Sequence, residues 1–136
     1  MAYTDFLKTQ CYIDGQWVNA DSGATFEVTD PGSGQVIGTV PKAGAVETAR
    51  AIDAAEAALP AWRAKTAGER AKLMRKLFDL MIEHQDDLGE LLSREQGKPF
   101  AEGKGEIVYG AGFIEWFAEE GKRAYGDVIP SHAADR

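Results

Sequence analysis

The stretch SREQGKPFAEGKGE, from Ser93 to Glu106, contains three glycines and two lysines, a composition that could bind phosphate. A phosphate-binding loop needs G-x-x-x-x-G-K followed by Ser or Thr, so that amides cradle the phosphates and the hydroxyl binds magnesium. Here five residues rather than four separate Gly97 from Gly103, and a glycine occupies the hydroxyl position. We therefore interpret Gly97 as a helix C-cap and Pro99 as the opening of the next helix.

A second glycine-rich stretch, GSGQVIG from Gly32 to Gly38, superficially resembles a dinucleotide-binding fingerprint. That fingerprint requires G-x-G-x-x-G between a strand and a helix. Ile37 stands where the third glycine should be, and the residues that follow favour a strand. The stretch is therefore predicted to be the turn of a β-hairpin.

The side chains that could act as nucleophiles, bases or metal ligands are few. Cys11 is the single cysteine, and His84 and His132 are the only histidines available as its base. No spacing typical of a zinc site is present. The carboxylate pairs Asp86-Asp87 and Glu119-Glu120 are interpreted as solvated helix faces and caps. The sequence thus indicates no catalytic and no cofactor-binding residue, and no complete active site.

An aromatic cluster near the C-terminal end is the remaining candidate for binding. It consists of Tyr109, Phe113, Trp116 and Phe117. Two roles remain open for it, a buried core, which is the commoner role, and the wall of a ligand site.

Composition restricts the class of partner. The chain has 136 residues, a formal net charge of -7 and a pI of about 4.8, with no clustered basic residues, which argues against nucleic acid and anionic membranes. The uncharged run IVYGAGFI is far shorter than the roughly 20 apolar residues of a membrane helix. The lone cysteine and the absence of a secretory pattern at the N-terminus favour a cytoplasmic protein.

The elements that must position these residues fall into two parts. Strands are predicted over about residues 11–41, as two hairpins that turn at Asp14-Gly15 and at Pro31–Gly34. Helices follow over about residues 44–125, and a tail over 126–136. Two isolated hairpins are marginal in water, and no central strands are available for the helices to cover. The sequence therefore predicts part of a larger domain.

The helical region has recognisable signals for helix starts and stops. The first helix should carry an apolar stripe that includes Val46, Ile52 and Leu59, and Pro60 should end or kink it. Thr66 and Glu69 form a capping box at the next start, and a stripe of Leu73, Leu77, Phe78 and Met81 follows. Asp86 or Asp87 is expected to cap a short third helix, and the last helix should stop near Gly126.

Ordered motifs along the chain resemble the N-terminal portion of the aldehyde dehydrogenase superfamily. They include YIDGQWV, FEVTDPGSGQVIGTVPKA, EQGKP and FIEWFAEEGKRAYGDVIP, and they extend from about Tyr12 to Arg136. EHQDDL, EQGKP and FIEWFAEEGKR most resemble bacterial succinate-semialdehyde dehydrogenase. The resemblance implies an α/β fold with N-terminal β-hairpins plus about four amphipathic helices, which form an incomplete part of the cofactor-binding domain, residues 1–136 being its N-terminal portion.

The resemblance also implies a chemistry. In the family a Cys thiolate adds to the aldehyde, hydride passes to NAD or NADP, and a Glu-activated water releases the acid. These residues and the cofactor-binding strands are expected to lie beyond Arg136, so this chain alone should bind no cofactor tightly and be inactive. Cys11 matches none of the family's motifs.

Two sets of site residues follow from the resemblance alone. Tyr109 and Phe113 are expected to line the tunnel through which aldehyde enters. A monovalent cation is expected to bind the backbone carbonyls of Val28 or Thr29 and of Glu95.

The leading hypothesis is an N-terminal fragment of an NAD(P)-dependent succinate-semialdehyde dehydrogenase, which oxidises succinate semialdehyde to succinate as in 4-aminobutyrate degradation. Another aldehyde, and NAD in place of NADP, remain open. The expected partners are the remainder of the dehydrogenase chain and a small aldehyde substrate. The parent is expected to be a homo-oligomer and the fragment to self-associate. The alternative is a non-catalytic helical interaction module that binds a partner or itself through its apolar helix faces.

Overall fold

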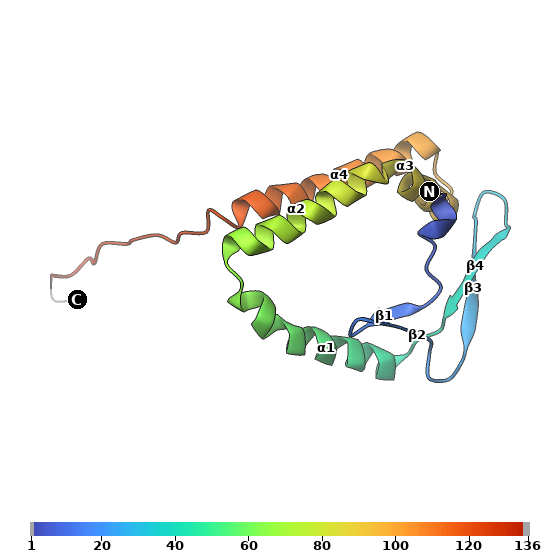
Figure 1. Ribbon diagram of the computed structural model, residues 1–136, viewed down its shortest axis with the longest axis horizontal. Coiled ribbons are helices and arrows are strands. Elements are labelled where there is room, and N and C mark those ends of the chain that lie inside the picture. Colours follow the sequence, from blue (N-terminus) through green and yellow to red (C-terminus); the bar gives the residue numbers. More distant parts are fainter. Residues whose placement is uncertain (1, 135–136) are drawn as a thin grey trace.

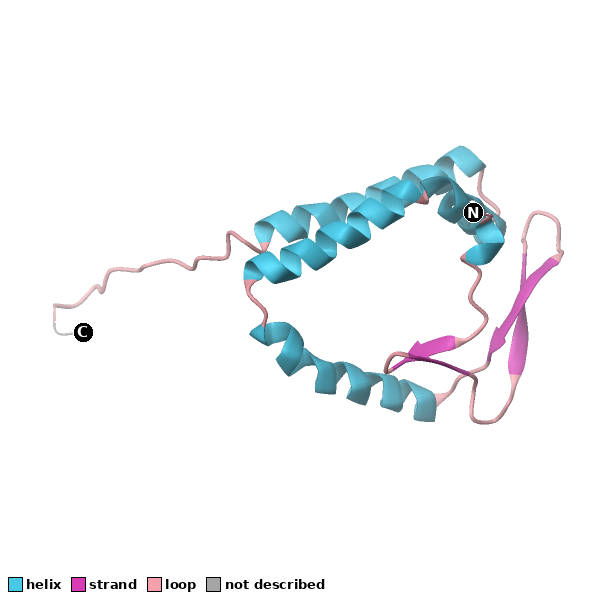
Figure 2. Cartoon of the chain, in the orientation of Figure 1, coloured by secondary structure: helices cyan, strands magenta, loops and turns pink. Residues whose placement is uncertain are grey.

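The structure is a computed structural model that describes residues 2–134. Its elements in chain order are the 3₁₀ turn η1 (Tyr3–Asp5), strands β1 (Cys11–Ile13), β2 (Gln16–Val18), β3 (Thr25–Thr29) and β4 (Val36–Pro41), and helices α1 (Ala45–Ala64), α2 (Ala67–Glu83), α3 (Gln85–Gln96) and α4 (Phe100–Glu120). In Figure 1, α2 and α4 run side by side along one edge of the molecule and α1 lies along the opposite edge. The strands gather at one end, as Figure 2 shows in magenta. The arrangement is open, with α4 packed against both α2 and α3.

The first hairpin confirms the predicted two-residue turn. Asp14 and Gly15 have φ angles of 51° and 74°, the positive values that such a turn requires. Antiparallel pairing then places Cys11 opposite Val18 and Ile13 opposite Gln16. The pair Asp-Gly adopts this conformation at little cost, because Gly lacks a Cβ and Asp tolerates the left-handed region.

The second hairpin is also confirmed, together with an irregularity. Strands β3 and β4 pair from Thr25 opposite Pro41 onward, and the register shifts between Val28 and Thr29. In the connecting turn, the Asp30 carboxylate accepts hydrogen bonds from the Gly32 and Ser33 amides at 2.7 and 3.2 Å. These bonds lower the pKa of Asp30.

Helix α1 differs from the prediction at its C-terminal end. Of the two predicted alternatives at Pro60, an end or a kink, the end is wrong, because the helix continues through Pro60 to Ala64. Proline lacks the N–H that would bond to the Glu56 carbonyl, and its ring crowds that carbonyl, but Glu56 is exposed, so water can take the place of the missing bond. The predicted stripe is on the helix but has no cover, because Val46, Ile52 and Leu59 are 65%, 62% and 54% exposed.

Helix α2 begins with the predicted capping box. Glu69 N–H donates to Thr66 Oγ1 at 3.2 Å, and Thr66 N–H donates to Glu69 Oε2 at 2.8 Å. The predicted apolar stripe is packed only in part, because Leu73 and Leu77 are exposed. Ala71 is the residue of α2 that becomes buried. The buried face of α2 therefore carries a small side chain, which allows a neighbouring element to approach α2 closely.

The junction between α2 and α3 corrects one prediction and the end of α3 confirms another. His84 is the N-cap of α3, so Asp86 and Asp87 lie in its first turn instead of capping it. Their charges there still favour the helix, because the N-terminal end of the helix dipole is positive. At the other end Gly97 has a φ of 71° and donates to the Ser93 carbonyl at 2.8 Å, as a left-handed C-cap should.

The last helix begins at Phe100, directly after Pro99, and ends at Glu120 rather than near Gly126. The C-cap residue Gly121 has a φ of −58°, so it is not a left-handed cap. Gly126, the predicted stop, has a φ of 74° but lies beyond the end of the helix. The segment that follows carries no helix or strand through residue 134 and runs away from the other elements in Figure 1.

The buried apolar residues among those described are small. They are Ala20, Ala71, Ala111 and Ala118. Large apolar side chains remain exposed on α1, α2 and α4, which is the pattern expected of a domain that lacks part of its core. Within residues 2–134 no helix is both long and apolar enough to cross a membrane.

Candidate functional site

The aromatic cluster forms one face of α4. Tyr109, Phe113 and Phe117 follow one another at intervals of four, and Val108, Gly112 and Trp116 form a parallel row. Residues four apart lie on the same side of a helix, so the two rows make a continuous apolar strip. The rings of Tyr109 and Phe113 meet edge to face, with centroids 4.9 Å apart and planes at 85°.

This strip borders a groove of about 460 Å³. Its lining residues are Val108, Tyr109, Gly112, Phe113, Trp116 and Phe117. A Cβ atom on Gly112 would meet no atom within 4 Å, so this glycine leaves an open notch between the rings. Since every lining residue belongs to α4, the groove is one wall of a site rather than an enclosed pocket. Tyr109 is 69% and Phe113 49% exposed, so the cluster is not core within this chain.

The opposite side of α4 fixes the direction in which the aromatic face points. Ala111 and Ala118, which are 0% and 2% exposed, lie one above the other on the buried side of α4. Arg75 of α2 donates to Glu115 at 2.6 Å and to Asp79 at 3.1 Å. These carboxylates raise the pKa of Arg75, with Asp79 the larger cause. Helix α4 is thus held against α2 while the aromatic strip faces away.

The C-terminal end of the strip is charged. A neighbouring groove of about 270 Å³ shares Gly112 and Trp116 with the aromatic groove and continues to Glu119, Glu120 and Arg123. Lys122 lies 2.7 Å from the Glu119 carboxylate, and this hydrogen bond lowers the pKa of Glu119. An apolar path beside a charged rim suits a small ligand with one apolar and one charged part.

The two segments expected to hold a cation lie next to each other. A Cβ atom on Gly97, after α3, would come within 2.8 Å of Pro31 Cγ in the turn between β3 and β4. Glu95 is in the last turn of α3, where backbone carbonyls point out of the helix and its dipole is negative. The irregularity at Val28 and Thr29 interrupts the regular ladder between β3 and β4. These features fit a carbonyl-lined cation site. Among residues 2–134 no three acidic, His or Cys side chains cluster as metal ligands, a different kind of site.

The described residues do not fit a dinucleotide. The Gly32–Gly38 stretch lies in the turn and second strand of a hairpin, and the Gly97–Gly105 stretch is a helix cap followed by α4. Neither places a glycine-rich loop between a strand and a helix N-terminus, where a pyrophosphate binds. Cys11 pairs with Val18 in a hairpin strand, and the His84 ring contacts Phe6 with centroids 5.0 Å apart.

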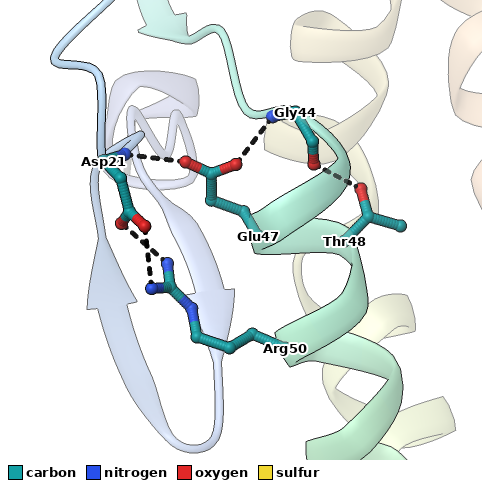
Figure 3. Close-up of polar contacts among 5 residues, drawn as sticks. All are labelled: Asp21, Gly44, Glu47, Thr48 and Arg50. Atoms are coloured by element: carbon teal, nitrogen blue, oxygen red, sulfur yellow. Dashed lines mark hydrogen bonds and ion pairs between the residues drawn. The ribbon is translucent and has the colours of Figure 1, made fainter.

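A polar contact that the sequence analysis missed involves Glu47, which is 6% exposed. Its carboxylate accepts hydrogen bonds from the amides of Asp21 and Gly44, as Figure 3 shows. Arg50 pairs with the Asp21 carboxylate through both terminal nitrogens, at 3.0 and 2.9 Å. The position of Glu47, three residues after Gly44 at a helix start, is that of a capping-box glutamate and would have identified its local role. Its bond to Asp21 had no signal in the sequence.

Comparisons with known proteins agree with this architecture. The profile of the aldehyde dehydrogenase family matches residues 17–136. Glutarate-semialdehyde dehydrogenase of Pseudomonas putida is 62% identical over 130 residues, which cover 96% of this chain and 27% of that protein. The NADP(+) succinate-semialdehyde dehydrogenase of Escherichia coli (strain K12) is 59% identical over 133 residues, which cover 98% of this chain and 28% of that protein.

A solved structure gives the same result. The crystal structure of an E. coli NADP dependent enzyme matches with a TM-score of 0.93 and 59% sequence identity, over 97% of this chain and 27% of that chain. The two hairpins and four helices correspond to the N-terminal part of such structures. The chain thus spans about 27% of the length of the relatives it matches. With a family profile that covers most of its length and relatives this similar, the chain belongs to the aldehyde dehydrogenase family.

Proposed function

We propose that this chain is the N-terminal portion of an NAD(P)-dependent dehydrogenase that oxidises a semialdehyde bearing a carboxylate, with succinate semialdehyde as the first candidate. The observation that carries the proposal is the 62% and 59% identity to glutarate- and succinate-semialdehyde dehydrogenases. The product would be the dicarboxylate, as in 4-aminobutyrate degradation. The parent enzyme is proposed to be a cytoplasmic homo-oligomer.

Glutarate semialdehyde is the main alternative substrate. It differs from succinate semialdehyde by one methylene, which an apolar site typically discriminates by only about 1–3 kcal/mol. Identities of 62% and 59% over a segment that is 27–28% of each relative do not favour either substrate strongly. The residues that recognise the distal carboxylate are proposed to lie outside this chain, because a carboxylate calls for a cationic partner and no lysine or arginine lines the aromatic groove.

The contribution of this chain to the enzyme is proposed to be positional. Tyr109 and Phe113 would form one apolar wall of the aldehyde tunnel, which agrees with their exposure and with the groove they line. The remainder of the parent enzyme would supply the facing wall of the tunnel, the nucleophile, the base and the cofactor site. Accordingly, the 136-residue chain is proposed to be inactive alone and to bind NAD or NADP only within the whole enzyme.

A structural cation is proposed where the end of β3 and its following turn meet the C-terminal end of α3. The carbonyls of Val28 or Thr29 and of Glu95 would be its ligands from this chain. The close contact between Gly97 and Pro31 supports this assignment, because it brings the two segments together. Backbone carbonyls suit a hard monovalent cation, whose binding leaves little trace in side-chain identity.

The residues that determine the choice between NAD and NADP are proposed to lie in the parent enzyme, outside this chain. The E. coli relative carries NADP(+) in its name, whereas another solved relative, 34% identical, was determined in complex with nicotinamide adenine dinucleotide. Both cofactors should therefore be tried in any assay.

The test is a chimera in which this chain replaces the matching segment of the E. coli succinate-semialdehyde dehydrogenase. We expect the chimera to oxidise succinate semialdehyde with NADP, and the isolated chain to give no rate above a blank. Glutarate semialdehyde is assayed in parallel, and the ratio of kcat/KM values for the two substrates should match that of the E. coli enzyme if the residues that recognise the carboxylate lie outside this chain. A folded chimera without activity toward either semialdehyde would contradict the proposed function, and turnover by the isolated chain would contradict its inactivity.

A non-catalytic interaction module is the second candidate, favoured by the exposed stripe on α1 and the exposed strip on α4. Apolar faces of this size invite association, and we propose that the isolated chain self-associates. Sedimentation velocity over a dilution series distinguishes the possibilities. A compact monomer at every concentration would contradict self-association and weaken the module hypothesis.

A further inference from the structure

Glu47 joins two parts of the chain that are far apart in sequence. It belongs to the first turn of α1, and its Oε2 accepts from the Gly44 amide at 2.8 Å, which is an ordinary local cap. Its Oε1 accepts from the Asp21 amide at 2.7 Å, in the turn that Gly23 closes by bonding to the Ala20 carbonyl. One carboxylate therefore satisfies an amide at the start of a helix and an amide in the loop after the first hairpin.

A second contact reinforces the first. Arg50, one turn further along α1, makes a bidentate ion pair with the Asp21 carboxylate. Asp21 is thus bound to α1 through both its amide and its side chain (Figure 3). Arg50 is the charged side chain that helps to lower the pKa of Glu47, and the Asp21 carboxylate pairs with Arg50.

Apolar packing adds little at this junction. The large apolar residues of α1 at Val46, Ile52 and Leu59 are exposed, and the residue of α1 that is buried is Glu47 itself. A helix held by few apolar contacts takes its direction from the directional bonds at its end. Because a buried carboxylate without hydrogen-bond partners is costly, the two amides also restrain Glu47 in return.

We propose that Glu47 is a positioning residue whose carboxylate acts as a clasp. By binding the loop that follows β2, it fixes the direction of α1 relative to the first hairpin. The clasp keeps the exposed stripe of α1 in a defined orientation relative to β1 and β2 before any other part of the protein packs on it. This inference does not rest on the proposed dehydrogenase activity. The hydrogen bonds also lower the pKa of Glu47, with the Asp21 amide as the larger cause, so the clasp is ionised at neutral pH.

The chain contains a matched control. Glu69 occupies the equivalent position of α2 and accepts from the Thr66 amide and hydroxyl, both at 2.8 Å. Its bonds stay within its own helix start, whereas one bond of Glu47 crosses to residue 21. Glu47→Gln and Glu69→Gln therefore remove the same charge from the same kind of cap, and only the first should disturb the angle between α1 and the hairpin.

The experiment measures a distance that changes with that angle, by double electron–electron resonance spectroscopy. Spin labels are placed at Gln16→Cys on β2 and Ala57→Cys on α1, both exposed positions, in a Cys11→Ser background. We expect a narrow distance distribution for the parent and for Glu69→Gln, and a broad one for Glu47→Gln. Amide hydrogen exchange of Asp21 should become about tenfold faster in Glu47→Gln, the effect of losing roughly one charge-assisted hydrogen bond.

An unchanged distribution and unchanged Asp21 exchange in Glu47→Gln would overturn the proposal. Equal broadening in Glu69→Gln would also overturn it, because the effect would then be general loosening. If Glu47→Gln does not fold, the parent chain still decides the matter by NMR. The amide protons of Asp21 and Gly44 should then titrate with the same midpoint as the Glu47 carboxylate, and independent midpoints would overturn the clasp.

Discussion

Gly103 of α4 lies so close to Gly89 of α3 that a Cβ atom on Gly103 would stand 2.7 Å from the Gly89 carbonyl oxygen. The same hypothetical atom would be 2.5 Å from Ser93 Oγ, and a Cβ on Gly89 would be 2.8 Å from Lys104 Cα. These distances are shorter than van der Waals contact, and two of the three atoms belong to the backbone. The crossing of α3 and α4 therefore depends on glycine at both positions.

Gly103→Ala should destabilise the chain, because the helices must separate to admit the methyl group. Overpacking of this kind typically costs about 1–3 kcal/mol. Gly105→Ala is the matched control on the same helix, since a Cβ there would meet nothing within 4 Å. It should stabilise α4 by up to about 1 kcal/mol through helix propensity. Urea denaturation followed by circular dichroism measures both, and equal effects of the two substitutions would contradict the close crossing.

The residue type alone does not show which of the four glycines inside α4 packs against another helix. Glycine costs a helix the same propensity wherever it stands. Whether that cost is offset by close packing depends on which helix lies opposite. That information is tertiary, and only the structure separates Gly103, which is in contact, from Gly105, Gly110 and Gly112, which face open space.

The capping box of α2 should make stability depend on pH. The Thr66 amide and hydroxyl lower the pKa of Glu69 below its usual value of 4.5. A carboxylate whose pKa is lower in the folded state contributes stability that is fully present above the unfolded value and is lost as pH falls through the folded value. Urea midpoints measured from pH 7 to pH 2 should fall less steeply in Glu69→Gln than in the parent. An identical pH dependence in both would contradict this role.

Thr66→Ala tests the other half of the same box. Removing the hydroxyl leaves the Glu69 amide without its partner, and loss of an N-cap typically costs about 1 kcal/mol. Thr66→Ser keeps the hydroxyl and serves as the control. Helix α2 content and urea midpoint should fall for Thr66→Ala and stay close to the parent for Thr66→Ser. If both variants lost the same stability, the methyl group and not the cap would be responsible.

Features that depend on a few adjacent residues were predicted well, and features that depend on contacts between distant segments were not. The turn at Asp14-Gly15, the box at Thr66 and the cap at Gly97 each depend on a few adjacent residues, and each was confirmed. The helix patterns could not say whether α1 would end at Pro60 or continue through it, nor which stripe residues, such as Leu73 and Leu77, would stay exposed. These depend on solvent access and on which face meets another helix. A periodic stripe shows that a face is apolar, but it does not say which other element will cover it.

A monovalent cation should stabilise the whole enzyme if the proposed carbonyl site exists. At a concentration ten times its dissociation constant, a ligand that binds only the folded state stabilises it by about 1.4 kcal/mol. The chimera should therefore melt at a higher temperature in KCl than in tetramethylammonium chloride at equal ionic strength. Gly97→Ala, which is strained at φ 71° and crowds Pro31, should abolish the difference. Equal melting temperatures for the unsubstituted chimera in the two salts would contradict the cation site.

The aromatic wall should affect turnover by the whole enzyme and leave the stability of this chain almost unchanged. In the active chimera, Tyr109→Ala and Phe113→Ala remove ring surface from the groove, and each should lower kcat/KM for the semialdehyde by about tenfold, equivalent to about 1.4 kcal/mol of transition-state binding. Phe26→Ala is the control, because Phe26 is an exposed ring on β3 that does not line the groove. Its kcat/KM should stay within about twofold of the parent, as expected for an exposed residue that does not line the groove. Since both groove residues are exposed in this chain, their removal should leave its stability almost unchanged. A loss of activity that only mirrors a loss of stability, or one shared equally by Phe26→Ala, would contradict the assignment of Tyr109 and Phe113 to the tunnel.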